Sequence, residues 1–396
     1  MSDAPSAAAA PRASVAAASG VLPAQEIRRL IAEGRIAAAS PTSLSGARTD
    51  VTDAPVRDDQ VQPASLDLRL GSVAYRVRAS FLAGHSATVA QRLDDFAMHE
   101  IDLRGGAALE TGCVYVAPLQ ERVRLPKDVS GVANAKSSTG RLDLFTRLIT
   151  DHGAEFDRVA PGYEGPLYAE ISPRTFSVLA RAGDRLNQIR LRRGSPAFAA
   201  DQIEALQSEH QLISGAQPAS GGGLRFSVDL EPGDGRPVGY RARRNSALID
   251  LAKLDHYDPS DFWDPLTPRR FGAGGALGVI LYPGAFYILV SRERVRVPPD
   301  LAAEMTPYLA VVGEFRVHYA GFFDPGFGCE ETGGAGARGV LEVRCHEAPF
   351  ALEHGQTVGR LVYEPMLARP DILYGEGIGS NYQAQGLRLS KHFKQG

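Results

Sequence analysis

A short stretch at residues 133–144, ANAKSSTGRLDL, gathers side chains suited to binding phosphate. Lys136 and Arg141 supply positive charge, and the hydroxyl groups of Ser137 and Ser138 can donate hydrogen bonds to phosphate oxygens. The stretch differs from the Gly-rich loop ending in Gly-Lys-Ser/Thr that usually binds phosphate. The alternative is structural: a helix begins here, a serine caps it, and the basic side chains are exposed. Composition alone slightly favours this alternative.

Other common catalytic patterns are absent from the sequence. It has no His-x-Glu with Pro-Cys-x-x-Cys, which zinc-dependent deaminases use, and no His-Glu-x-x-His or Gly-x-Ser-x-Gly motif. The Gly-rich segment 272–278 lacks the lysine and the helix of a phosphate loop, and 333–339 is interpreted as a flexible loop. The nine histidines are scattered, so each is interpreted as a surface or packing residue.

Composition indicates a soluble enzyme without nucleic-acid or membrane partners. The 396 residues carry a net charge of −3, with 22% charged residues, so electrostatics does not favour nucleic-acid binding. No apolar run approaches the ~18 residues of a membrane-spanning helix. Cys113, Cys329 and Cys345 form no Cys-x-x-Cys pair, which fits a reducing cytoplasm. Residues 1–20, rich in Ala, Ser and Pro, lack a secretory signal pattern and are expected to form a flexible tail.

The elements that would position a site are mainly strands. Apolar residues follow helical spacing in 24–38 and in 200–214, which predicts a short amphipathic helix in each half of the chain. Elsewhere, short runs alternate apolar and polar residues between Gly and Pro, which is typical of half-buried strands joined by tight turns. Examples of expected strands are 65–70, 114–119, 167–171, 287–291 and 340–345.

The two halves of the chain repeat one another. Five pairs of segments match in the same order, which indicates a tandem duplication with units at 21–198 and 199–396. Each unit is predicted to be a mainly β domain preceded by a short helix, and such duplications often build a pseudo-symmetric oligomer. The pairs are 24–38 with 200–214, 64–79 with 226–243, 116–133 with 289–305, 165–171 with 339–344, and 182–191 with 354–363.

Several segments together resemble the dCTP deaminases of the dUTPase-like, or β-clip, superfamily. They cover most of the chain and follow the family's order. The resemblance implies a long form with two tandem dUTPase-like β-clip domains. The segments are the start of the family (20–36 and 60–71), its Arg-Ser-Ser-x-x-Arg motif (AKSSTGR, 135–141), its Asp-Pro-Gly motif (GFFDPGFG, 321–328), the segment with its catalytic glutamate (339–366) and its nucleotide-covering tail (374–393).

The resemblance implies deamination of a cytosine ring without a metal-bound water. A glutamate would act as general base on water and return the proton to the ring nitrogen or to the departing ammonia. Such a carboxylate needs a shielded pocket that raises its pKa toward neutrality, and an arginine that orients it or stabilises developing charge. No catalytic metal is expected, and Mg²⁺ would accompany the nucleotide triphosphate.

Two glutamates match the family's position in the middle of a strand, Glu170 in LYAEIS and Glu342 in GVLEVR. A glutamate facing inward from a strand is seldom structural unless it is paired. Glu342 is preferred as the general base. In the alternative, Glu170 works with Arg141 inside the first domain, and the second domain is a degenerate structural half.

The two copies have diverged in a complementary way. The first copy retains the 136–141 motif and Gln188, which matches a glutamine on the phosphate side of the family's site, whereas the second has MTPYLAVVGEF in the corresponding place. The second copy retains an uninterrupted Asp-Pro-Gly at Asp324 and the tail, whereas extra residues follow Asp157 in the first.

This divergence suggests a composite site, because sites in the superfamily lie between subunits. The first domain would supply the motif and Gln188, and the second would supply the aspartate, the glutamate and the tail. The expected catalytic residues are Glu342, Arg141 and Ser137, with Glu170 as the alternative base, and the expected substrate-binding residues are Lys136, Ser137, Ser138, Arg141, Gln188, Asp324, Tyr374 and Gln385.

Two departures from the family pattern bear on phosphate binding. Lys136 replaces the usual arginine, which keeps the charge and loses the bidentate fork. Asn381 stands where the family tail has a lysine that meets the triphosphate. Arg388 or Lys391 could supply that charge. If neither does, triphosphate affinity should be weaker, or a different phosphorylation state preferred.

Three functions are compatible with these residues. The first is deamination of dCTP to dUTP and ammonia. The second is a dUTP diphosphatase or a bifunctional enzyme in which Asp324 activates water, which the Asp-Pro-Gly motif and the tail SNYQAQG disfavour. The third is a non-catalytic nucleotide-binding protein, which the retained motif and strand glutamate disfavour. The expected partners are dCTP and dUTP, and further copies of the chain in a homo-oligomer.

Overall fold

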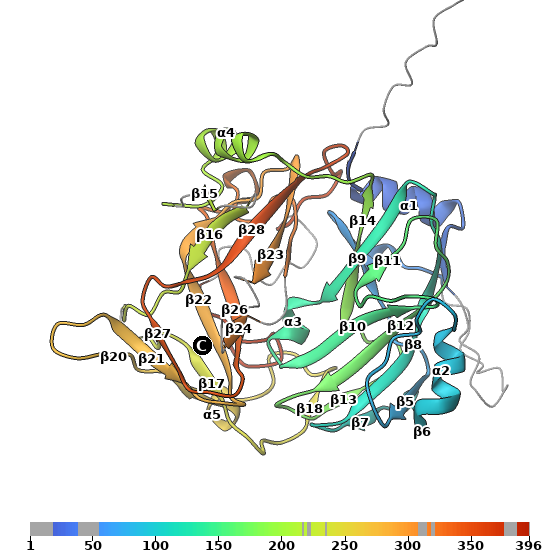
Figure 1. Cartoon of the computed structure of the whole chain (residues 1–396), viewed down its shortest axis with the longest axis horizontal. Helices are drawn as coiled ribbons and strands as arrows, with labels where there is room; N and C mark the ends of the chain where they lie inside the picture. Colours follow the sequence, from blue (N-terminus) through green and yellow to red (C-terminus); the bar gives the residue numbers. More distant parts are fainter. Residues whose placement is uncertain are drawn as a thin grey trace, which may run out of the picture.

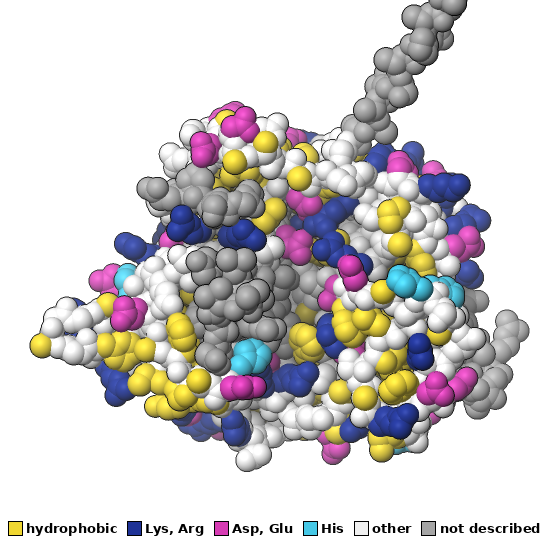
Figure 2. Space-filling view, viewed as in Figure 1, with side chains coloured by type: hydrophobic (Ala, Val, Ile, Leu, Met, Phe, Trp, Pro, Cys, Tyr) yellow, Lys and Arg dark blue, Asp and Glu magenta, His cyan; other side chains and the backbone are white. Residues whose placement is uncertain are grey.

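The chain folds into two β domains that lie side by side (Figure 1). The computed structural model describes residues 19–38, 55–215, 218–219, 223–233, 236–307, 315–317, 321–375 and 386–395. Figure 2 shows the molecule from the same side as Figure 1. On this side the surface is hollowed between the two domains, and basic and acidic side chains gather around the hollow.

The first domain contains two six-stranded antiparallel sheets. One has the order β11-β9-β14-β4-β3, with β1 also paired to β14. Its strands are β1 (Gly20–Val21), β3 (Val61–Gln62), β4 (Ser65–Leu68), β9 (Val129–Ala135), β11 (Arg158–Val159) and β14 (Asn187–Arg193). The other has the order β10-β12-β8-β5-β6, with β2 also paired to β8. Its strands are β2 (Ile36–Ala38), β5 (Val73–Val77), β6 (Ala97–Asp102), β8 (Val114–Arg124), β10 (Leu144–Thr150) and β12 (Glu164–Pro173).

The second domain has two five-stranded sheets, ordered β15-β16-β28-β23-β25 and β19-β17-β22-β26-β24. The first comprises β15 (Pro218–Ala219), β16 (Gly223–Ser227), β23 (Leu301–Pro307), β25 (Phe322–Phe323) and β28 (Thr357–Pro365). The second comprises β17 (Tyr240–Ala242), β19 (Trp263–Pro265), β22 (Phe286–Val295), β24 (Phe315–Val317) and β26 (Ala337–Cys345). A small sheet joins β20 (Arg269–Arg270), β21 (Leu277–Leu281) and β27 (Phe350–Glu353).

One small sheet is shared between the domains. In the first domain β7 (Ala107–Leu109) pairs with β13 (Val178–Ala180), and β18 (Ile249–Asp250) of the second domain adds to β13 in parallel. Hydrogen bonds of the main chain therefore cross the domain junction.

The sheets confirm that the chain is duplicated. Strand order is the same in the corresponding sheets of both domains. Glu170 lies opposite Val116 on β8, and Glu342 lies opposite Ile288 on β22, at equivalent points of the two ladders. Hydrogen bonds repeat as well: the Tyr115 hydroxyl accepts from the amide of Glu110, and the Tyr287 hydroxyl accepts from that of Tyr282. The two predicted strand glutamates therefore occupy matching positions.

The helices are few and short. They are α1 (Ala24–Ala32), α2 (Val89–Phe96), α3 (Ser137–Gly140), α4 (Ala200–His210) and α5 (Pro259–Phe262), with 3₁₀ turns at Asp58–Gln60 and Glu330–Thr332. In the described ranges no helix is long and apolar enough to cross a membrane.

The predicted helices α1 and α4 form but end earlier than the spacing indicated. After α1 the chain turns at Gly34, which has a φ of 67°, and Ile36 enters β2 instead of continuing the helix. After α4, Gln211 takes a left-handed conformation with a φ of 49°. Helix α2, which was not predicted, is capped by the Thr88 hydroxyl, which accepts from the amide of Gln91.

One hydrophobic core extends across the junction. Its buried residues include Leu144 and Phe176 of the first domain and Trp263 and Ile288 of the second. The C-terminal segment 386–395 packs into this core through Phe393, whose ring is fully buried. Its ring centroid lies 5.3–6.4 Å from those of four other aromatic residues, Phe176, Tyr257, Phe262 and Trp263. Aromatic contacts of this kind add to the stabilisation from burial.

Replacing Phe393 by alanine should destabilise the junction of the two domains. Removing a fully buried ring costs roughly 3–5 kcal/mol, which corresponds to a fall of about 5–10 °C in the unfolding midpoint. Thermal unfolding followed by circular dichroism measures this fall. Met98→Ala is the control, because Met98 is 62% exposed. Equal midpoints for the two variants would show that Phe393 does not hold the junction.

Candidate active site

Arg141 and Glu342 form an ion pair across the domain junction. Arg141 follows the single turn of α3, and Glu342 lies in the middle of β26. The guanidinium Nε lies 3.6 Å from the carboxylate Oε1, and the two side chains are only 3% and 6% exposed. Arg141 also donates from Nη1 to the main-chain oxygen of Arg388, 3.3 Å away. The structure thus brings together the predicted arginine of one copy and the preferred glutamate of the other.

The environment of Glu342 raises the pKa of its carboxyl group to about 7. Removal from water is the largest cause, because burial disfavours the charged form, and the charge of Arg141 acts in the opposite direction. Within the described residues Glu342 has no ion pair other than that with Arg141. A carboxyl group that titrates near neutral pH can take a proton from water and give it back.

A second ion pair with reversed charges lies two residues further along both segments. The carboxylate of Asp143 accepts from the guanidinium of Arg344 at 2.8 Å and from the hydroxyl of Thr175 at 2.6 Å. Asp143 is buried and has a φ of 53°, a left-handed conformation that Asp adopts more readily than most residues. Because both pairs join the same two segments, they fix the position of Arg141 along β26.

Glu170, the alternative general base, is occupied by other groups of the first domain. Its carboxylate accepts from Nη2 and Nε of Arg147 at 2.5 and 3.1 Å, and from the hydroxyl of Ser80 at 2.6 Å. The guanidinium of Arg147 lies 3.4 Å from the ring centroid of Phe156. In the described part of the chain Arg141 pairs with Glu342 and not with Glu170. The equivalent glutamates thus have different partners.

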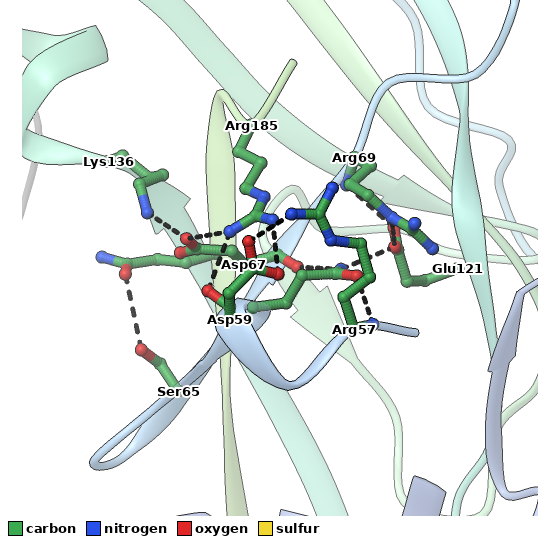
Figure 3. Close-up of polar contacts among 10 residues, drawn as sticks. Arg57, Asp59, Ser65, Asp67, Arg69, Glu121, Lys136 and Arg185 are labelled. Carbon is green, nitrogen blue, oxygen red and sulfur yellow. Dashed lines mark hydrogen bonds and ion pairs between the residues drawn. The ribbon is translucent and has the colours of Figure 1, made fainter. Parts of the chain in front are cut away.

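Lys136 lies at the opposite end of α3 from Arg141 and faces the first sheet. Its ammonium pairs with the carboxylate of Asp67 on β4. The guanidinium of Arg185 lies 3.8 Å from the same carboxylate and 2.8 Å from that of Asp59. Figure 3 shows Lys136 and Arg185 converging on Asp67. Two cations therefore share one buried carboxylate.

A row of polar side chains crosses the sheet beside Lys136. Gln188 on β14 lies opposite Asp67 on one side and opposite Asn134 of β9 on the other. Its amide donates to Oδ1 of Asn134 at 3.0 Å, and its oxygen accepts from the hydroxyl of Ser65 at 3.4 Å. Gln188 thus belongs to the polar surface that includes the carboxylate bound by Lys136.

Ser137 and Ser138 begin the turn of α3. The residue at the N-cap is Lys136, and no side chain caps the turn, so the structural alternative of a serine cap is wrong. Ser138 is buried, and its main-chain oxygen accepts from the hydroxyl of Ser390 at 2.8 Å. Ser137 is half-buried.

Asp324 also meets the first domain. Its carboxylate accepts from Nη2 of Arg190 at 2.9 Å, and Arg190 is a fully buried residue of β14 whose guanidinium lies 4.1 Å from the ring centroid of Phe322. Burial raises the pKa of Asp324, and the charge of Arg190 opposes this shift. Asp67 and Lys136 also affect this pKa, so Asp324 shares their electrostatic environment.

Tyr374 packs on the Asp-Pro-Gly turn. Its amide donates to the oxygen of Pro325 at 2.8 Å, and its ring centroid lies 5.4 Å from that of Phe327. Gln385 and Asn381 lie outside the described residues, as does the segment 308–314 of the second copy.

Sequence reasoning missed four charged residues of this region: Asp67, Asp143, Arg190 and Arg344. A usable signal existed for two of them. Asp67 stands between Leu66 and Leu68, and Arg190 between Ile189 and Leu191. A charged residue flanked by buried apolar neighbours needs a partner, and this holds for these two residues as it does for the strand glutamates.

The described residues contain no group of three or more His, Cys, Asp or Glu side chains placed to hold a metal ion. The expectation of a reaction without a catalytic metal stays a prediction.

Comparison with known proteins matches both halves of the chain to one family. The family model for the N-terminal domain of 2′-deoxycytidine 5′-triphosphate deaminase matches residues 18–195, and that for the C-terminal domain matches residues 199–393. A solved structure of 2′-deoxycytidine 5′-triphosphate deaminase from Agrobacterium tumefaciens is 51% identical, with a TM-score of 0.77, over 89% of this chain and 99% of that one.

Shorter relatives match about two fifths of the chain. A "dCTP deaminase, dUMP-forming" from Corynebacterium glutamicum is 30% identical over 176 residues, which are 41% of this chain and 88% of the relative. One of the same name from Kocuria rhizophila is 31% identical over 40% of this chain and 82% of the relative. A "dCTP deaminase" from Shewanella amazonensis is 35% identical over 29% of this chain and 59% of the relative.

The duplicated antiparallel sheets and the ion pairs between them define a two-domain protein of the mainly β class. More particularly, the chain belongs to the dCTP deaminase family, in a long form that carries both domains.

The raised pKa of Glu342 predicts how Glu342→Gln changes stability with pH. The pKa of Glu342 is about 7 in the folded protein, against a usual value of 4.5 that applies to the unfolded chain. Between pH 4.5 and pH 7 the folded protein therefore binds more protons than the unfolded chain does. The free energy of unfolding therefore falls as pH rises through this window. Glutamine has no proton to lose, so the variant should gain up to about 3 kcal/mol relative to the wild type from pH 4.5 to 7.5.

Urea unfolding of both proteins at several pH values measures this relative gain. Asp157→Asn is a positive comparison, because burial raises the pKa of Asp157 to about 7 as well. A stability difference between wild type and Glu342→Gln that stays constant with pH would contradict a raised pKa at Glu342.

Proposed function

We propose that the protein is a dCTP deaminase, converting dCTP and water to dUTP and ammonia at a composite site between its two domains. The observation that carries the proposal is the buried Arg141–Glu342 pair, in which a carboxyl group with a pKa of about 7 faces an arginine from the other domain. Membership of the family supports the substrate and the reaction.

Glu342 acts as the general base in this proposal. Its carboxylate takes a proton from water while the water oxygen bonds to C4 of cytosine, and the resulting carboxylic acid gives that proton to N3. A tetrahedral intermediate with a hydroxyl and an amino group on C4 forms. Glu342 then moves the hydroxyl proton to the amino group, the C4–N bond breaks, and ammonia leaves as the C4 carbonyl forms. Proton transfer of this kind is typically worth 10²–10⁴-fold in rate.

Arg141 keeps Glu342 oriented and stabilises charge that develops at the ring. The separation of 3.6 Å between Nε and Oε1 exceeds that of a good hydrogen bond, so the carboxylate can still accept a proton from water. The reversed pair Asp143–Arg344 holds the two segments in place. Such preorganised charge costs little reorganisation during the reaction.

The remaining predicted residues would bind the substrate. We assign Lys136, Ser137, Ser138 and Gln188 to the phosphate side, and Asp324, Tyr374 and Gln385 to the nucleotide on the second domain. Mg²⁺ would accompany the triphosphate without taking part in deamination. A homo-oligomer and a cytoplasmic location complete the proposal.

Comparing Glu342→Gln with Glu170→Gln tests the assignment of the base. Glu342→Gln should lower kcat by about 10²–10⁴-fold, because the group that moves the proton is lost. Glu170→Gln is the matched control at the equivalent strand position. Because it breaks the Arg147 pair, it should lower the unfolding midpoint, while its kcat should change far less than that of Glu342→Gln. Ammonia release from dCTP measures kcat for both variants, and thermal unfolding measures the midpoint. Full activity in Glu342→Gln would refute the composite site.

A second candidate function is deamination followed by release of pyrophosphate. Relatives from Corynebacterium glutamicum and Kocuria rhizophila carry the name "dUMP-forming". In this chain the aspartate that would activate water, Asp324, is already paired with Arg190, which favours release of dUTP. Chromatography of the nucleotide product formed from dCTP and Mg²⁺ separates the possibilities. We expect dUTP; dUMP with pyrophosphate would mean a bifunctional enzyme, and tight binding without ammonia a non-catalytic one.

A further inference from the structure

A cavity of about 790 Å³ lies between the two domains, where β26 ends and β10 begins. The first domain lines it with the start of β10 and the segment 174–177, and the second domain lines it with 244–246 and 344–347. None of the described residues assigned above to catalysis or to substrate binding lines this cavity. It is therefore separate from the proposed deaminase site, and its volume falls in the range of about 300–1,000 Å³ that small-molecule sites have.

Two arginines of the cavity, Arg174 and Arg244, have no carboxylate partner among the described residues. The guanidinium of Arg174 lies 5.5 Å from the ring centroid of Phe145, which also lines the cavity. The guanidinium of Arg244 donates from Nη2 to the main-chain oxygen of Pro283 at 3.3 Å. Both arginines are exposed, and each belongs to a different domain. The two domains thus each present a positive charge that is available to a ligand.

The other charged groups of the cavity do not offset these two arginines. The guanidinium of Arg344 pairs with the carboxylate of Asp143 at 2.8 Å, so their charges cancel. Glu347, an exposed residue, is the second carboxylate of the lining, and His346 is neutral at neutral pH unless an acidic partner raises its pKa. Three arginines therefore face two carboxylates, which leaves an excess of positive charge in the cavity. A positively charged hollow raises the local concentration of anions.

The lining suits a phosphate group attached to a planar ring. Guanidinium groups bind phosphate oxygens through parallel N–H donors, and the hydroxyl of Thr111 and the amide of Asn245 add further polar groups. A phosphate ion alone would fill only a small part of 790 Å³. Phe145 provides an apolar wall next to Arg174, and a planar ring can pack against the phenyl ring and the flat guanidinium. The size and the chemistry together indicate a compound the size of a mononucleotide.

The cavity is connected to the segment that carries Arg141. Asp143 and Arg344, which line the cavity, form the ion pair two residues beyond the Arg141–Glu342 pair on both segments. The main-chain oxygen of Asp143 accepts from the amide of Arg174 at 3.0 Å. A ligand held by arginines of both domains would therefore fasten the junction directly beside the Arg141–Glu342 pair.

We propose that this cavity is a second ligand site, which binds a phosphorylated compound of mononucleotide size and ties the two domains together. Arg174 and Arg244 bind the phosphate from opposite domains, and Phe145 contacts the ring. The proposal goes beyond deamination and does not depend on it, because the two sites share no residue. A phosphate on a planar ring is common to purine and pyrimidine nucleotides, so the experiment includes one of each.

Calorimetry with AMP, dTMP and inorganic phosphate tests the proposal on wild type, Arg174→Met, Arg244→Met and Arg225→Met. Loss of a charge-assisted contact should weaken binding of the preferred nucleotide by about 10- to 100-fold in the two cavity variants. Arg225→Met is the matched control, because Arg225 is an exposed arginine of β16 outside the cavity, and it should bind as wild type does. Arg174→Lys should recover only part of the affinity, since lysine keeps the charge and loses the fork.

Thermal unfolding separates ligand binding from a structural role of the arginines. Without nucleotide the three methionine variants should unfold at the midpoint of wild type, because each replaced side chain is exposed. The preferred nucleotide should raise the midpoint of wild type and of Arg225→Met, and raise that of the cavity variants less. Unchanged affinity in both cavity variants, or inorganic phosphate binding as tightly as the nucleotides, would overturn the proposal.

Competition with dCTP distinguishes the cavity from the substrate site. The Glu342→Gln protein, which should turn dCTP over slowly, is saturated with dCTP and then titrated with the nucleotide. Binding that persists and depends on Arg174 supports a second site, whereas displacement by dCTP would place the nucleotide in the substrate site and contradict the proposal. Binding through Arg174 in a wild-type protein that releases no ammonia from dCTP would refute only the proposed function.

Discussion

The carboxyl group of Glu342 is removed from water in the middle of a strand, and much of the site follows from that constraint. A buried carboxylate needs an opposite charge or a proton. Here the opposite charge comes from Arg141 of the other domain, at a distance that leaves the carboxyl group with a pKa of about 7. The pair therefore depends on where Arg141, directly after α3, lies relative to Glu342 on β26. The shared core, the strand β18 added to the first domain and the buried ring of Phe393 all serve to keep that arrangement unchanged.

Duplication makes the same strand position serve two purposes. Glu170 and Glu342 occupy equivalent points of the two ladders. Glu170 is satisfied by Arg147 and Ser80 within its own domain, so it stabilises the fold. Glu342 instead faces the neighbouring domain. Asp324, like Glu342, is a carboxylate of the second domain whose arginine partner, Arg190, belongs to the first domain. The carboxylates of Glu342 and Asp324 thus have their arginine partners only when the two domains are packed together.

Much of this arrangement could be predicted from the sequence. Alternating apolar residues and repeated segments were enough to predict the duplicated sheets, and Arg141 with Glu342 could be chosen by resemblance. Helix ends depended on local turns at Gly34 and Gln211, which spacing alone does not reveal. The partners of Asp67, Asp143 and Arg190 could not be found from periodicity, because each lies far away in the chain. The burial of Phe393 among rings from both sides of the junction is likewise a property of the folded core.

The reversed charge pairs at the junction have a consequence for evolution and for engineering. On the first domain the order is Arg141 then Asp143, and on the second it is Glu342 then Arg344. A slip of one domain by two residues against the other would place like charges opposite one another. The alternating charges therefore specify a single register between the two domains. A chimaera that exchanges one domain for that of a relative should keep both pairs intact. Substitutions at these four positions should accordingly arise as compensated pairs, never singly.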